Sequence, residues 1–304
     1  MQLVDKTKYW NELINSLINT SYEKIENFVS FLLKSTLSTA IFGSLRTYYP
    51  FLLFGAVINW NLLLATFLVI FAVYCMNNLT DKEEDEVNSP DKASFVNKNQ
   101  KTLTFAVGSS YIIAIILGLL DSIYAVFILL VPLFAGVIYS IKVSSKLPRL
   151  KDIFAVKNII IALSWAVVTT FIPAINAINV SWAFIIPLFY FFFVKSFVNS
   201  VVCDIRDIEG DTANGIRTIP VGIGKEKTKR ILTALTFSIM PVISILLFYG
   251  LSIGYFITMA FSMINSYWHI NYVSNAKEVS KYMSLLVHGE WIFVLVLCYI
   301  ITLV

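Results

Sequence analysis

The chain has 304 residues, of which 58% are hydrophobic and 14% charged; its mean hydropathy is +0.76 and its formal net charge +4. Soluble domains are about half apolar and a quarter charged. This composition therefore excludes an ordinary soluble protein and predicts an all-α, multi-pass membrane protein. We expect no nucleic acid among its partners, and no cleavable signal peptide. Three cysteines lie in or beside apolar segments and are interpreted as small core residues: Cys75, Cys203 and Cys298.

The first 34 residues form a separate N-terminal segment in which lysines alternate with apolar residues. Examples are Lys6, Lys24 and Lys34, with Trp10 and Ile25 between them. This amphipathic pattern predicts a helix that lies on the surface of the lipid bilayer, ahead of a membrane domain over residues 35–304.

Nine apolar segments follow, each long enough to cross a bilayer. They are predicted at about 35–58, 62–81, 103–119, 123–141, 153–172, 182–203, 229–249, 252–272 and 283–303. The loops after the second, fourth, sixth and eighth segments carry nearly all the loop lysines and arginines. By the positive-inside rule these loops and the N-terminus face the cytoplasm, and nine spans place the C-terminus outside the cell membrane.

Two acidic motifs follow the second and sixth spans, over residues 77–88 and 204–214. They align without a gap, which predicts pseudo-symmetric halves within one domain. The aligned residues are Asn78, Asp81 and Asp85 in the first motif and Asp204, Asp207 and Asp211 in the second. The acidic spacing places these side chains on one face of a helix, where carboxylates repel each other unless a cation bridges them. Oxygen ligands without histidine or cysteine favour Mg²⁺, which proteins often hold together with substrate phosphates.

A diphosphate head at this polar mouth and a hydrocarbon tail in the apolar bundle describe a prenyl diphosphate. Mg²⁺ held by Asp81, Asp85, Asp207 and Asp211 would stabilise the leaving diphosphate, so these four residues are predicted to be catalytic. Tyr139 is a candidate for shielding the allylic cation. Basic residues of the loops, Lys92, Lys98 and Arg217, are candidate phosphate ligands. Polar residues inside the spans, Arg46, Lys195 and Asn199, are candidates for binding the diphosphate or an acceptor carboxylate.

The chain resembles the UbiA-type intramembrane prenyltransferases over residues 35–304. Three stretches carry the resemblance: Asn77-Asn78-Leu79-Thr80-Asp81-Lys82-Glu83-Glu84-Asp85; Asp204, Asp207 and Asp211 with Gly215-Ile216-Arg217-Thr218-Ile219-Pro220; and Tyr139-Ser140 with Lys142, Arg149 and Lys151. On this resemblance Asn77, Lys142 and Lys151 join the substrate-binding candidates.

The resemblance implies a helical bundle around a central cavity that opens sideways to lipid. It implies Mg²⁺-dependent transfer of an isoprenoid chain from a prenyl diphosphate to a lipophilic acceptor, in many members an aromatic ring of a quinone pathway and in archaeal members a glycerophosphate lipid. Two departures affect the site. Asn78 replaces the usual aspartate, which predicts weaker metal binding. Lys142 follows Tyr139 by three positions instead of four, so the lysine that contacts the diphosphate stays open.

Three other readings stay open. A terpene cyclase on the same scaffold would ionise the diphosphate without a second substrate. A transporter is suggested by the many spans and the buried charges, although the charges gather at one mouth and not at the midplane. A non-catalytic family member is suggested by Asn78 alone, and the intact aspartates of both motifs argue against it.

Overall fold

The computed structural model describes residues 2–80, 86, 89–140, 153–178, 180–213, 215–276 and 287–303, without the side chains of 2–17, 137–140 and 302–303. Across these residues the chain is helical and has no strand. The helices are α1 (Gln2–Lys34), α2 (Leu37–Leu53), α3 (Trp60–Thr80), α5 (Pro90–Lys98), α6 (Gln100–Asp121), α7 (Ile123–Ser140), α8 (Val156–Ile175), α9 (Trp182–Arg206), α10 (Ile208–Ala213), α11 (Ile219–Ile223), α12 (Lys225–Phe237), α13 (Ile239–Phe248), α14 (Ile253–Asn275) and α16 (Glu290–Leu303).

Five helical segments of the described chain are long and apolar enough to cross a membrane, namely α3, α6, α8, α9 and the continuous pair α12–α13. A sixth arises if the end of α1 and α2 count as one bent span. These segments confirm a helical membrane protein, whereas nine spans stay a prediction. Of the other predicted spans, α14 carries Asn265, Ser266 and His269, which lower its hydropathy.

The longest spanning helix, α9, lies at the centre of the largest hydrophobic cluster. It packs against α8, α13 and α14, and its fully buried Leu188, Phe191 and Phe192 face these neighbours. A helix that is apolar on most of its surface can be buried on all sides. The burial of α9 therefore fixes where its last turn, which begins the second acidic motif, emerges from the bundle.

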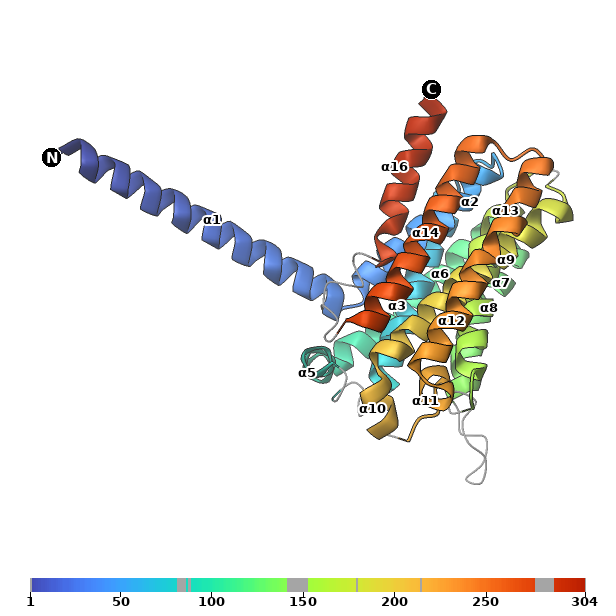
Figure 1. Cartoon of the computed structure of the whole chain (residues 1–304), viewed down its shortest axis with the longest axis horizontal. Coiled ribbons are helices and arrows are strands. Elements are labelled where there is room, and N and C mark those ends of the chain that lie inside the picture. Colours follow the sequence, from blue (N-terminus) through green and yellow to red (C-terminus); the bar gives the residue numbers. More distant parts are fainter. Residues whose placement is uncertain are drawn as a thin grey trace.

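The described residues that flank the first acidic motif lie at the same end of the bundle as the second motif. Figure 1 shows α5, which follows the first motif, and α10, which belongs to the second, at the same end. The long α1 leaves the bundle near α5 and projects away from it (Figure 1). Between α1 and α2 the chain bends by 72°, and Thr36 there has a φ of 64°. This left-handed conformation is uncommon for a β-branched residue and ends the first helix.

Candidate active site

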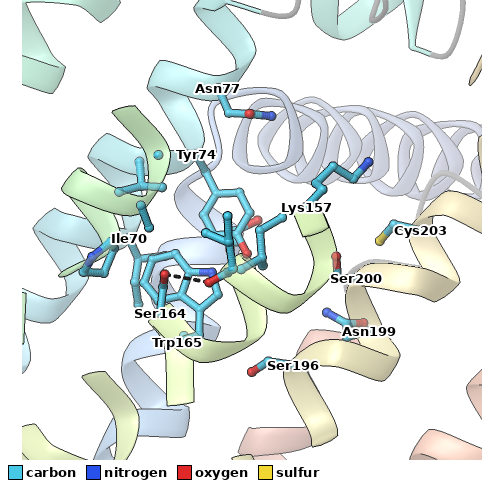
Figure 2. A pocket seen from close by; sticks show the side chains of 18 of the residues that line it. Ile70, Tyr74, Asn77, Lys157, Ser164, Trp165, Ser196, Asn199, Ser200 and Cys203 are labelled. Carbon is cyan, nitrogen blue, oxygen red and sulfur yellow. Dashed lines mark hydrogen bonds between the residues drawn. The ribbon is translucent and has the colours of Figure 1, made fainter. Parts of the chain in front are cut away.

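A cavity of about 280 Å³ lies between α2, α3, α7, α8 and α9 and reaches the second acidic motif. Its polar lining includes Arg46, Asn77, Lys157, Ser164, Ser196, Asn199, Ser200, Asp204, Asp207, Asp211 and His288. Its apolar lining includes Phe42, Ile70, Ile161 and Trp165. Figure 2 shows polar side chains from α8 and α9, among them Lys157, Asn199 and Ser200, around one side of this space. The cavity therefore joins a charged mouth to an apolar interior.

At the mouth, Asp204 is buried and fully engaged by α8. Its Oδ1 lies 2.8 Å from Lys157 Nζ, and its Oδ2 accepts a hydrogen bond of 2.8 Å from Asn158 Nδ2. Asn158 also donates to Ser200 Oγ at 2.9 Å. These contacts join α8 to α9 at the cavity. They also hold the Lys157 ammonium beside the carboxylates.

The other two aspartates of the second motif are less fully engaged. Asp207 accepts two hydrogen bonds from its neighbour Arg206, at 2.7 and 2.8 Å, and its side chain is 21% exposed. Asp211 is buried, and its Oδ2 has no hydrogen-bond partner. Burial raises the pKa of the Asp211 carboxyl to about 6, while Lys157 acts in the opposite direction. A cation placed beside Asp211 would lower that pKa, because it favours the ionised form.

The donor atoms of the second motif suit a hard cation. The buried Asp211 Oδ2 lacks a partner, and the three cavity-lining aspartates offer oxygen atoms alone, as Mg²⁺ prefers. Within the described residues no three acidic, histidine or cysteine side chains lie close enough together to form a complete metal site. The first motif's Asp81 and Asp85 lie outside those residues. The second motif can therefore supply some of the ligands of a Mg²⁺ site. Asp204 is the least available of its three aspartates, because both of its carboxylate oxygens already have protein partners.

Aromatic side chains line the cavity on the side of α3 and α8. The rings of Tyr74 and Trp165 stack with centroids 5.6 Å apart and an interplanar angle of 4°, and Figure 2 shows them side by side next to Ile70. Aromatic faces carry negative electrostatic potential and attract cations. This wall can accommodate a hydrocarbon chain and can shield a carbocation near the mouth.

Deeper in the bundle, Arg46 of α2 reaches the cavity with spare donor capacity. Its NH1 group donates to Ser196 Oγ at 3.1 Å, whereas its buried Nε has no partner. Asn199, on the same side of α9 as Ser196, has an unpaired buried Oδ1. Unsatisfied buried polar groups are costly. Both side chains are therefore available to a polar or anionic ligand group.

The Lys195 ammonium, in contrast, already has protein partners. Its Nζ lies 2.7 Å from Glu290 Oε1 and donates to Ser262 O at 2.9 Å and Ser266 Oγ at 2.6 Å. Both members of the ion pair are buried, and together they tie α9 to α14 and α16. Beside them lies a second cavity of about 30 Å³, which shares Arg46 and His288 with the main cavity.

The sequence matches the family model described as "UbiA prenyltransferase family" over residues 36–300, which is most of the chain. The chain belongs to the UbiA prenyltransferase family. This confirms the family resemblance and the membership of an enzyme family of prenyltransferases.

Two curated relatives carry the name digeranylgeranylglyceryl phosphate synthase. The protein of Sulfurisphaera tokodaii is 28% identical over 62% of this chain and 66% of its own length. That of Saccharolobus solfataricus is 29% identical over 61% of this chain and 64% of its own length. The matched part of the chain thus spans slightly less than two thirds of these relatives. A UbiA homologue from Archaeoglobus fulgidus, solved with GPP and Mg²⁺, shares the fold with a TM-score of 0.64 at 15% identity, over 90% of this chain and all of its own.

The UbiA fold brings some predicted site residues to the cavity and leaves others away from it. Asn77, Arg46, Asn199 and the three aspartates of the second motif line it. Asn78 is buried and accepts a hydrogen bond of 3.1 Å from Lys92 Nζ. Lys98 and Arg217 are exposed and do not line the cavity. The remaining predicted residues lie outside the described residues, or outside the described side chains in the case of Tyr139: Asp81, Asp85, Tyr139, Lys142 and Lys151.

Four residues of the candidate site were not predicted from the sequence. Lys157 and Asn158 are polar residues inside the predicted fifth span, which is the same signal that singled out Arg46 and Lys195. Tyr74 and Trp165 carry no such signal, because aromatic residues are common throughout this apolar chain. Glu290, an acidic residue inside the predicted ninth span, is the counter-ion of Lys195.

Proposed function

We propose that this UbiA-family protein transfers a prenyl group from a prenyl diphosphate to a lipophilic acceptor with an anionic head group, and that the reaction depends on Mg²⁺. One observation carries the proposal. A single cavity contains carboxylates and Lys157 at its mouth, an aromatic wall, and a half-buried Arg46 whose buried Nε is unpaired. The mouth is proposed to face the cytoplasm, because the loops on the side of the acidic motifs carry most of the loop lysines and arginines.

The mouth is suited to the donor's diphosphate. Asp207 and Asp211, with Asp81 and Asp85 of the first motif, would hold Mg²⁺, which offsets negative charge on a diphosphate when it is bound. Lys157 is held at the mouth by Asp204, and it is proposed to contact a phosphate oxygen of the donor. Together these groups stabilise the charge that develops as the bond between the prenyl carbon and oxygen breaks.

The interior is suited to the prenyl cation and its tail. The bonding electrons leave with the diphosphate, and the remaining allylic cation lies against the faces of Tyr74 and Trp165. The acceptor oxygen or carbon then bonds to the prenyl carbon and releases its proton. Because the wall is apolar, it keeps water from quenching the cation before the acceptor reacts.

Arg46 is proposed to bind the acceptor's anionic group, supported by Ser196 and Asn199. A phosphate on a prenylated glycerol fits this chemistry, and the curated relatives are named for such a product. The aromatic acceptor of a quinone pathway is the second candidate, because a guanidinium binds a carboxylate as well as a phosphate.

The proposal predicts labelled product from radiolabelled geranylgeranyl diphosphate only when Mg²⁺ and an acceptor are both present. Purified protein in lipid nanodiscs would be supplied with geranylgeranylglyceryl phosphate, with a hydroxybenzoate, or with no acceptor, each with Mg²⁺ or EDTA. Product from the glycerophosphate supports the first candidate, and product from the hydroxybenzoate supports the second. Diphosphate release without acceptor, yielding a cyclic hydrocarbon or alcohol, would establish the cyclase reading instead.

Arg46→Gln is expected to raise the acceptor KM by about 10- to 100-fold, because hydrogen bonds to charged groups contribute about 1.5–3 kcal/mol. The KM for the prenyl diphosphate should stay close to that of the unaltered enzyme. Steady-state kinetics with each substrate varied in turn would measure both values. Lys98→Gln, which removes an exposed charge outside the cavity, is the matched control. A larger change in the donor KM than in the acceptor KM would assign Arg46 to the diphosphate.

A further inference from the structure

The N-terminal helix α1 exposes a stripe of large apolar side chains along its described half. Ile18, Tyr22, Ile25 and Phe28 are 59–65% exposed. Their spacing of three and four residues places them along one side of the helix. Asn19, Glu23 and Asn27 lie on the opposite side. Nothing in the described bundle covers this stripe, because α1 contacts the bundle only near its C-terminal end (Figure 1).

The direction of α1 selects a membrane surface as the partner. A 72° bend separates α1 from α2, which packs against the spanning helices α3 and α8. Because α2 packs alongside these spanning helices, a helix bent by 72° from α2 points away from the bundle, as a helix that lies on the bilayer surface does. The first 34 residues also balance four acidic against four basic side chains. Apolar burial, and not attraction to anionic lipid, would therefore drive the binding.

The last turns of α1 contact the segment that follows the first acidic motif. The rings of Phe31 and Phe95 meet edge to face at 6.1 Å, and Lys34 Nζ lies 3.8 Å from Asp91 Oδ2. Asp91 and Phe95 belong to α5, and the next residue after Asp91 is Lys92, which binds Asn78. Movement of α1 would thus be transmitted to α5 and, through Lys92, to Asn78, which precedes the predicted metal ligand Asp81.

We propose that α1 lies in the boundary between the head groups and the acyl chains of the bilayer, with its apolar stripe towards the chains, and that its last turns hold α5 against the bundle. The bilayer then supports α5 and, through Lys92, Asn78. The placement of α1 in the bilayer and its contact with α5 do not depend on turnover by the enzyme.

The placement is tested by spin labels in the full chain, reconstituted at low density into phosphatidylcholine vesicles. Labels are introduced by Ile25→Cys on the stripe or Asn27→Cys on the polar side, and the unaltered chain gives the background from Cys203. We expect oxygen collisions to exceed nickel-chelate collisions severalfold more at position 25 than at position 27. Equal nickel-chelate access at both positions would overturn the lipid contact. Spin–spin coupling between labels at position 25 would instead assign the stripe to a second copy of the chain.

The contact with α5 is tested by hydrogen exchange of the same reconstituted protein. Ile18→Glu/Ile25→Glu is expected to speed exchange of the amides in Pro90–Lys98, because a charged stripe would leave the bilayer. Asn19→Glu/Asn27→Glu adds the same charge to the polar side and should leave that exchange unchanged. Equal exchange in both double variants would overturn the support of α5 by α1. Both measurements give a result whether or not the protein transfers prenyl groups.

Discussion

Asp207→Ala is expected to lower the rate of prenyl transfer by about 10³-fold, the upper part of the range for removing one group that stabilises developing charge. Asp207 lines the mouth of the cavity and aligns with Asp81 in the first motif. Its loss removes a predicted Mg²⁺ ligand and the two hydrogen bonds that Asp207 accepts from Arg206. The measurement is single-turnover formation of product from labelled prenyl diphosphate at saturating Mg²⁺.

Glu209→Ala provides the matched control for this variant. Glu209 lies two residues away in α10, carries the same charge, is exposed and does not line the cavity. It should keep nearly full activity. The melting temperature of Asp207→Ala should stay near that of the unaltered protein, since the Asp207 side chain is partly exposed and its partner is its own neighbour. Full activity in Asp207→Ala would refute a two-motif metal mechanism.

Lys195→Met is expected to reduce the free energy of unfolding by about 3–5 kcal/mol, because it leaves the Glu290 carboxylate buried without its counter-ion. Glu290 also accepts hydrogen bonds from Ser262 and Asn265, but neither supplies a compensating charge. Unfolding of the purified protein in mixed micelles, followed by loss of helix signal, would measure the difference. Lys227→Met, which removes an exposed lysine of α12, should change the stability very little.

The double variant Lys195→Met/Glu290→Leu separates the ion pair from the individual charges. Replacing both members of a buried pair by apolar residues is often neutral or stabilising. We therefore expect the double variant to be more stable than Lys195→Met, with a coupling energy of about 1–3 kcal/mol for contacting residues. If the double variant loses as much stability as both single variants together, Lys195 and Glu290 act independently, and the ion pair does not carry the effect.

The class of the protein and part of its candidate site follow from the sequence alone. Long apolar segments can satisfy their backbone groups in lipid only as helices, so composition alone predicts a helical membrane protein. The two aligned acidic motifs predicted a shared mouth, and the three described aspartates line one cavity. Arg46 and Asn199 were found because polar groups are costly inside a membrane, and both line that cavity.

Which side chains are available to a substrate depends on how the helices pack in three dimensions. Lys195 had the same sequence signal as Arg46, but its ammonium is occupied by Glu290, 95 residues away in the sequence. Lys157 reaches the mouth because α8 packs against α9, and Tyr74 stacks on Trp165 because α3 approaches α8 there. The periodicity of a sequence describes one helix at a time. Which partner a polar or aromatic group meets depends on how helices distant in sequence pack together. That packing leaves Arg46 with an unpaired Nε and gives the Lys195 ammonium a full set of protein partners.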